Sequence, residues 1–228
     1  MERRLPPEYA GWQAHEAAFR RMTTPELVVE IQDGSPERRL AALSVIDLAD
    51  VAPSTVEDWI RALPDAEANE LAGAIPAQRP HSSCKEDLRW VDVARLGYEQ
   101  RKLPTFLVML FSSLEALDAR DCPEAAGAWE TISDWLGGVY DRLVDDGDQE
   151  ALDDISLFVF ENYLVREPVF EAFCAILSRQ PELSRLVSTN PSFLLGGLSE
   201  AQKRTALLEA EEGGGLPFAQ SWALMHDL

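Results

Sequence analysis

The chain has 228 residues, of which 46% are apolar, and its 40 acidic residues outnumber 20 basic residues to give a net charge of −20. A chain of this length and hydrophobicity can bury a substantial core, so the composition predicts a folded protein with an acidic surface. The charge argues against binding to nucleic acid or to an anionic membrane, because both kinds of surface attract cationic side chains.

The apolar spacing before residue 77 predicts short amphipathic helices that begin at proline-marked turns. Thr24 and Ser35 each stand before a proline, which is typical of a helix start. The expected helices are 8–21, 24–32, 36–50, 53–63 and 66–75. The Pro- and Ser-rich segment 77–85 that follows predicts a surface loop. If the chain forms two subdomains and not one domain, their boundary is expected in this loop.

Segment 24–63, with its Asp-Gly-Ser-Pro turn at 33–36 and the run 37–43, resembles a HEAT-type helical repeat over roughly one repeat. A second segment of similar layout lies near 146–177. The aligned pairs are Leu43 with Ile155, Ser44 with Ser156 and Ile46 with Phe158. The resemblance implies stacked antiparallel helical hairpins of partly solenoid-like character.

The segment after the loop predicts a further helix at 86–100 and then a strongly apolar run at 103–117. Periodicity does not separate helix from strand over 105–111, but Leu114 and Leu117 continue the apolar pattern and favour a central buried helix.

Further helices are expected over 123–144, 148–160, 168–177, 181–187 and 199–212. Gly137 and Gly138 would interrupt the first of these, so a neighbouring helix approaches closely there or the helix kinks. The apolar run 155–160 predicts burial on most sides, and Gly213–Gly215 predicts a flexible hinge. Beyond the hinge, the apolar residues Phe218, Trp222 and Met225 form a candidate oligomer contact.

Residues 115–161 concentrate the charge, with 14 acidic residues and only two arginines, and so carry −12 of the net −20. An acidic turn, which we define as Asp145, Asp146, Asp148, Asp153 and Asp154, joins two of the predicted helices. Carboxylates at the start of a helix stabilise it by interacting favourably with the helix dipole, so part of this acidity is explained by helix formation itself. A loose divalent-cation site at Asp145, Asp146 and Asp148 is the alternative interpretation, although Gly147 does not fit the spacing of an EF-hand loop.

Cys84, Cys122 and Cys174 are odd in number and widely spaced. This pattern argues against a disulfide framework and predicts three ordinary thiols in a reducing cytoplasm. The residues before Tyr9 lack the apolar run of a secretory signal, and the 103–114 run is too short to span a bilayer. We therefore expect a cytoplasmic protein.

The sequence contains none of the residue clusters that define common catalytic or metal sites, so we expect no catalytic residue, cofactor or metal. His81 and Cys84 could meet as base and thiol, or as half of a zinc site, but they share an irregular loop. His226 near the C-terminus is a third isolated candidate.

The sequence predicts an all-α fold of about nine or ten helices, arranged as packed antiparallel hairpins in a single domain over 1–228. The expected function is a non-enzymatic protein-interaction module whose acidic turn binds a basic partner. One concrete version is a bacterial immunity or inhibitor protein for a cationic toxin. The alternatives are a metal-dependent helical enzyme that uses clustered carboxylates and a structural homodimer.

Overall fold

The computed structural model of the chain describes residues 7–48, 51–77, 83–189, 194–217 and 220–221. These residues are predominantly helical and form no β-strand, so the prediction of an all-α fold is confirmed. Apart from the short 3-10 helix at Pro7–Tyr9, they form twelve helices when the continuous run 149–163 is counted once, rather than the nine or ten expected.

The chain divides into two compact units, Met1–Cys122 and Pro123–Leu228, which we describe separately as unit 1 and unit 2. Much of the boundary segment suggested near 77–85 lies outside the described residues, which omit 78–82. A single domain over 1–228 stays a prediction.

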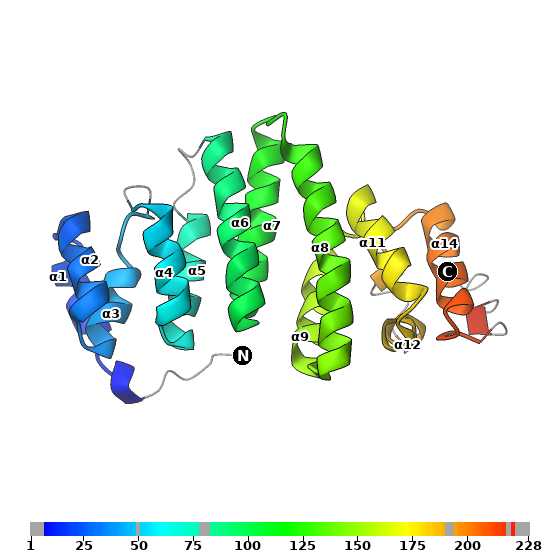
Figure 1. Cartoon of the computed structure of the whole chain (residues 1–228), viewed down its shortest axis with the longest axis horizontal. Coiled ribbons are helices and arrows are strands. Elements are labelled where there is room, and N and C mark those ends of the chain that lie inside the picture. The colour runs from blue at the N-terminus through cyan, green and yellow to red at the C-terminus, as the bar shows by residue number, and fades with distance from the viewer. Residues whose placement is uncertain (1–6, 49–50, 78–82, 190–193, 218–219, 222–228) are drawn as a thin grey trace. The chain divides into compact units, whose positions relative to one another are not determined.

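Unit 1 consists of a short 3-10 helix followed by seven α-helices (Figure 1). In chain order they are η1 (Pro7–Tyr9), α1 (Gln13–Phe19), α2 (Thr24–Asp33), α3 (Pro36–Leu43), α4 (Pro53–Ala62), α5 (Asp65–Ala77), α6 (Cys84–Arg101) and α7 (Pro104–Ala119). Successive pairs such as α2 with α3 and α6 with α7 pack together, and α3 and α7 both contact α5. This packing gives unit 1 a continuous apolar core.

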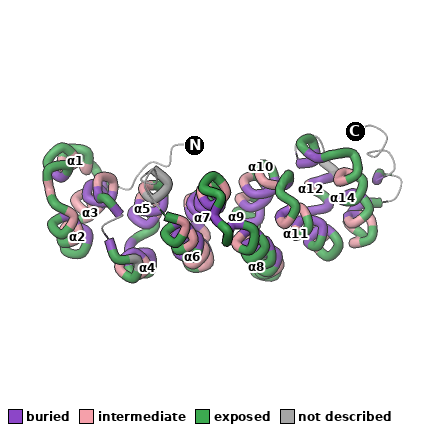
Figure 2. The backbone as a smooth tube through the Cα atoms, turned by 90° about the horizontal axis from the view of Figure 1, so that it is seen from above, coloured by how far each residue is buried: buried purple, intermediate pink, exposed green. Residues whose placement is uncertain are grey.

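Helix α7 is the most buried helix of unit 1, and its helical state confirms the interpretation of the apolar run at 103–117. It lies against α6, where both helices turn buried surfaces toward the interior (Figure 2). The ring of Phe106 on α7 packs directly on Gly97 of α6, because a Cβ at position 97 would lie 2.9 Å from Cγ of Phe106. A residue larger than glycine would therefore force this helix pair apart.

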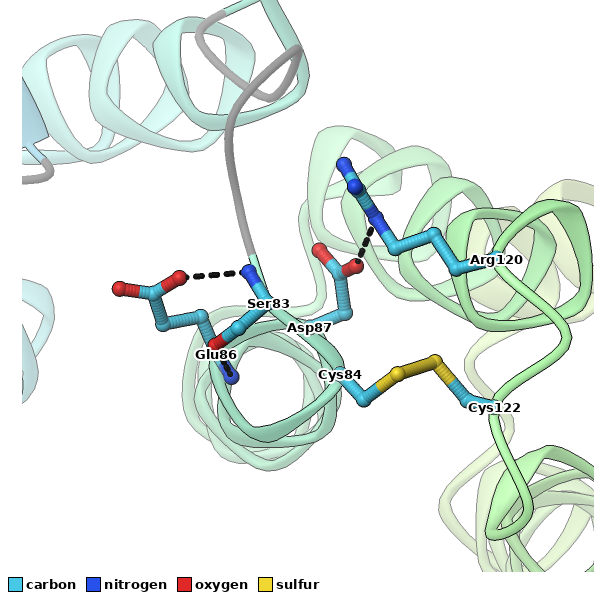
Figure 3. The surroundings of a disulfide bond; sticks show 6 residues. All are labelled: Ser83, Cys84, Glu86, Asp87, Arg120 and Cys122. Atoms are coloured by element: carbon cyan, nitrogen blue, oxygen red, sulfur yellow. Dashed lines mark hydrogen bonds and ion pairs between the residues drawn. A yellow bond between two sulfur atoms is a disulfide. The ribbon is translucent and has the colours of Figure 1, made fainter.

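Cys84 and Cys122 form a disulfide, and their Cα atoms are 5.8 Å apart (Figure 3). The prediction of three free thiols is wrong for these two residues, although Cys174 is free and buried. The odd number of cysteines was misleading because a count carries no information on which residues the fold brings together. Helices α6 and α7 are antiparallel and similar in length, so the chain returns after 38 residues to the point where α6 begins.

A partly buried ion pair lies beside the disulfide at the same end of the α6–α7 hairpin (Figure 3). The Asp87 side chain is fully buried, and Nε of Arg120 donates to its Oδ2 at 3.0 Å. The Ser83 hydroxyl accepts a hydrogen bond from the amide of Glu86, which caps the start of α6. Three different interactions therefore fix this end of the hairpin.

Unit 2 is built around a long helix, α8, which packs against α11 (Figure 1). In chain order its elements are α8 (Ala125–Asp146), α9 (Gln149–Asp154), the π-helical segment η4 (Ile155–Phe160), α10 (Glu161–Tyr163), α11 (Glu167–Leu177), α12 (Pro181–Thr189) and α14 (Glu200–Glu212). Helix α8 stays helical through Gly137 and Gly138. Nη2 of Arg179, a side chain just beyond the end of α11, lies 3.2 Å from the place that a Cβ on Gly137 would occupy, and the close approach of a helix there stays a prediction.

The segment Gly213–Gly215, which the sequence predicts to be a flexible hinge, brings the backbones of Gly213 and Gly215 close to other residues of unit 2. A Cβ on Gly213 would lie 2.6 Å from the carbonyl oxygen of Leu177, and one on Gly215 would lie 2.6 Å from Oγ of Ser184. Gly214 has a φ of +73°, which favours glycine. Gly213 and Gly215 are therefore closely packed in the turn after α14, whereas Gly214 is exposed.

Candidate partner-binding surface

The five carboxylates of the acidic turn all lie between the last residues of α8 and the end of α9. Asp145 and Asp146 are the last two residues of α8, Asp148 is the N-cap of α9, and Asp153 and Asp154 end α9. The side chains of Asp145, Asp146 and Asp153 are exposed, whereas those of Asp148 and Asp154 are half-buried. The predicted site residues therefore belong to one short, surface-exposed helix–turn–helix segment.

Gly147 and Asp148 produce this turn by ending one helix and starting the next. Gly147 has a φ of +68°, the left-handed conformation in which glycine commonly ends a helix. The amide of Asp148 then donates to the carbonyl oxygen of Leu143 at 3.0 Å. The carboxylate of Asp148 accepts a hydrogen bond from the amide of Ala151 at 3.2 Å, which caps α9.

Asp148 and Asp153 each make a hydrogen bond within α9. Asp148 is the α9 cap, as a carboxylate at a helix start is expected to be. Asp153 accepts a hydrogen bond from Nε2 of Gln149 at 2.8 Å within the same helix. Helix capping thus accounts for Asp148 but not for the carboxylates that precede it in the chain.

Asp145 and Asp146 lie where a carboxylate is unfavourable to helix stability. The last turn of α8 reads Leu143, Val144, Asp145 and Asp146, and it contains no basic residue. The C-terminal end of a helix carries the negative pole of its dipole, so each nearby carboxylate costs roughly 0.3–1 kcal/mol. The helix dipole therefore disfavours these two exposed carboxylates. Arg142, three and four residues earlier on α8, lies at a spacing that partly offsets this cost.

Asp141, one turn earlier on α8, shows how a carboxylate in this region can be neutralised. Nε of Arg179 donates to both of its carboxylate oxygens at 3.0 Å, and Nε2 of Gln180 donates at 2.8 Å. Partial burial raises the pKa of Asp141, but the hydrogen bonds from Arg179 and Gln180 outweigh that effect and leave the pKa below its usual value. Asp141 is thus part of the contact between α8 and the end of α11.

The apolar residues of α8 and α9 hold the acidic turn in place. Leu143 on α8 and Leu152 on α9 are buried, and the two helices contact each other directly. Ile155, the first residue after α9, is also fully buried. The carboxylates are therefore displayed on a packed scaffold, which reduces the conformational entropy that a partner would have to remove on binding.

The exposed apolar side chains next to the acidic turn do not follow from the sequence pattern. The apolar run 155–160 predicts burial on most sides, and that prediction is wrong for Leu157, which is 48% exposed. Val165, shortly after α10, is 62% exposed. The pattern misses Leu157 because the run 155–160, in which only Ser156 is polar, has no period that distinguishes an outer face.

The other candidate sites predicted from the sequence are not assembled in the described part of the chain. His81, His226 and the candidate oligomer contact at Phe218, Trp222 and Met225 lie outside the described residues. Cys84 is half of the disulfide and is not a free thiol. Within the described ranges, no three His, Cys, Asp or Glu side chains gather as a metal site would require.

The helices of the described segments include none that combines the length and the apolar character needed to span a bilayer. Comparison of the chain with protein-family models, with curated proteins and with solved structures found no match.

Proposed function

We propose that the chain is a non-enzymatic protein-interaction module whose acidic turn binds a basic partner. The observation that supports the proposal most is the position of Asp145 and Asp146. Both are exposed, and both lie at the helix end where carboxylates are unfavourable. A pair of charges that weakens its own helix is readily explained when a second protein supplies the cations.

Electrostatics gives this binding mode a defined character. Lys and Arg side chains of a partner would be attracted by the net charge of −20 and would dock where uncompensated carboxylates are concentrated. Such charges accelerate association and select the partner more than they increase affinity. The affinity should therefore fall as the salt concentration rises, because salt screens exposed charges.

The resemblance of segment 24–63 to a HEAT-type repeat suggests the same class of function. Stacked helical hairpins offer extended surfaces to other proteins. In the version of the proposal that names a biological role, the basic partner is a cationic toxin such as a nuclease, and the chain is its bacterial inhibitor.

A pull-down from cell lysate at low salt, with bound proteins identified by mass spectrometry, tests the proposal. The test variant is Asp145→Asn combined with Asp146→Asn. The control is Glu130→Gln combined with Asp134→Asn, which removes the same charge from two exposed positions on the same helix. We expect the control to retain the basic partners and the test variant to lose most of them. Equal recovery by both variants would contradict the proposal.

A further inference from the structure

A row of exposed side chains continues from the acidic turn along the run 149–163 and just beyond it. The row consists of Asp153, Leu157, Glu161 and Val165, which are spaced four residues apart and are all exposed. We call these four residues the mixed stripe, because acidic and apolar side chains alternate along it. Val169, the next residue at this spacing, is buried in α11 and ends the row.

The π-helical segment η4 helps to keep the mixed stripe on one side of the run. In an α-helix of 3.6 residues per turn, residues four apart drift by about 40° at each step. The wider i→i+5 turn of a π-helix takes more residues per turn and counteracts that drift. Because Ile155–Phe160 is π-helical, the row of side chains from Asp153 to Glu161 runs more nearly parallel to the helix axis than it would in a regular α-helix.

Leu157 and Val165 are unusual in their exposure. Among the described residues of unit 2, the large apolar side chains that are strongly exposed are Leu157, Val165 and Leu208 on α14. Two of these three therefore belong to the mixed stripe. Leu157 lies in η4 and Val165 lies eight residues later, in the turn that follows α10. Val159 and Phe160 between them are fully buried.

The charges around the two apolar residues are predominantly negative. Asp153 and Glu161 belong to the stripe itself, and Asp145, Asp146 and Glu150 are exposed nearby in the sequence. Arg166, at the far end, is stacked over the ring of Trp129 at 5.0 Å from its centroid. A ligand of this surface must therefore provide cations and apolar side chains together.

We infer that the mixed stripe binds an amphipathic, cationic helix of the basic partner, an inference that rests on the function proposed above. Leu157 and Val165 would contact two apolar side chains about two turns apart on that helix, which is the spacing of positions i and i+7. Lys or Arg residues beside those positions would face Asp153 and Glu161. The alternating chemistry of the stripe selects for this order of residues and not for positive charge alone.

The preference of the mixed stripe for an amphipathic helix can be measured with synthetic peptides, even though the natural partner is unidentified. The first is an 18-residue Leu/Lys peptide with leucines at helical spacing i, i+3, i+4 and i+7, and the second has the same composition in scrambled order. Fluorescence anisotropy would give both affinities for the full chain at two salt concentrations. The stripe variant is Leu157→Ser with Val165→Ser, and the control is Leu208→Ser, an exposed apolar residue elsewhere in unit 2.

We expect the wild-type chain and the Leu208 variant to bind the amphipathic peptide at least tenfold more tightly than the scrambled peptide. The stripe variant should lose that preference and retain its salt-dependent binding to both peptides. Circular dichroism would check its fold, and the milder single change Leu157→Gln replaces it if folding is impaired.

The outcomes separate this inference from the proposed function. Equal affinity of the wild-type chain for the two peptides, or an undiminished preference in the stripe variant, overturns the mixed-stripe inference. If neutralising Asp145 and Asp146 still weakens binding of both peptides in that case, the proposed acidic docking stands. Absence of salt-dependent binding to either peptide overturns both.

Discussion

Glu67 and Glu70 lie one turn apart on α5 and show two ways in which a carboxylate is accommodated away from water. Glu67 is fully buried and accepts hydrogen bonds from the Tyr9 hydroxyl at 3.0 Å and from Nε of Arg39 at 2.8 Å. Glu70 is half-buried, and burial raises its pKa, with a further contribution from the negative charge of Glu16. The ionised form of Glu70 is therefore less favourable in the folded chain than in the unfolded chain.

The raised pKa of Glu70 predicts that Glu70→Gln stabilises the chain at neutral pH. Below about pH 4, Glu70 is protonated in both the folded and the unfolded states, so the substitution should have little effect there. As the pH rises, the unfolded chain loses this proton first, and the folded wild type becomes less stable relative to the variant. Urea unfolding of both proteins at several pH values would measure the difference.

Glu130→Gln provides the control for this measurement, because Glu130 is exposed on α8. Its free energy of unfolding should stay close to that of the wild type at each pH. A gain in Glu70→Gln that is independent of pH would contradict the explanation by ionisation and would point to packing instead.

Local capping residues could be predicted from the sequence, whereas buried polar contacts between distant residues could not. Ser199 and Gln202, three residues apart, form a capping box at the start of α14, where the sequence predicts a helix over 199–212. At α2 the N-cap is Thr23 rather than the predicted Thr24, because Glu26 accepts from the amide of Thr23. By contrast, the partners of Glu67 lie 28 and 58 residues away in the sequence, and no short pattern links them.

At the scale of elements, the turn after α14 depends on glycine at position 215. A Cβ on Gly215 would lie 2.6 Å from Oγ of Ser184 and 3.0 Å from Cα of Pro181. We therefore predict that Gly215→Ala lowers the free energy of unfolding by about 1–3 kcal/mol, which is the usual cost of overpacking. Chemical denaturation followed by far-UV circular dichroism would measure this change.

Gly127 offers a control that is expected to respond in the opposite direction. It lies in the first turn of α8 and is exposed, and a Cβ there would have no atom within 4 Å. Gly127→Ala should stabilise unit 2 by up to about 1 kcal/mol, since alanine is the better helix former. If Gly215→Ala were also stabilising, the turn would be flexible, as the sequence alone suggests.

The helices that begin at proline-marked turns were predictable because their signals are local. Helices α2, α3, α4, α7 and α11 each have proline in their first turn. The π-helical segment η4 was not predictable, because the run Ile155–Phe160 contains six residues of which only Ser156 is polar, and this run has no helical period. Exposure of Leu157 depends on how the wider turn is oriented against its neighbours in unit 2, which is a property of packing and not of the pattern.

For the whole molecule, the net charge can be read directly from the sequence. Which carboxylates are paired with basic side chains depends on tertiary contacts. Asp141 and Asp145 both lie on α8 among the 14 acidic residues of 115–161. Arg179 pairs with Asp141 from 38 positions further along the chain. The acidic turn could therefore be located as a segment from the sequence, while the distinction between its capping residue Asp148 and the exposed pair Asp145 and Asp146 required the fold.

The disulfide between Cys84 and Cys122 changes what is expected of the chain in different redox environments. It links residues 38 positions apart, wholly inside unit 1, and such a link restricts the unfolded state. Reduction, or replacement of both residues by serine, should lower the free energy of unfolding by about 2–4 kcal/mol. The stability gained from the disulfide would be available in an oxidising compartment and lost in the reducing cytoplasm that the cysteine number suggests.

Guanidinium unfolding with and without reductant would measure this loss, and hydrogen exchange should show faster opening of α6 and α7 in the reduced chain. Cys174→Ser is the matched control, because Cys174 is free and buried, and burial raises the pKa of its thiol to about 12. This variant should retain the full difference between the oxidised and reduced states. Without reductant, thiol titration of the denatured wild type should detect one thiol. Three thiols, together with equal stability in both conditions, would show that the α6–α7 hairpin is held by packing and the Asp87–Arg120 ion pair alone.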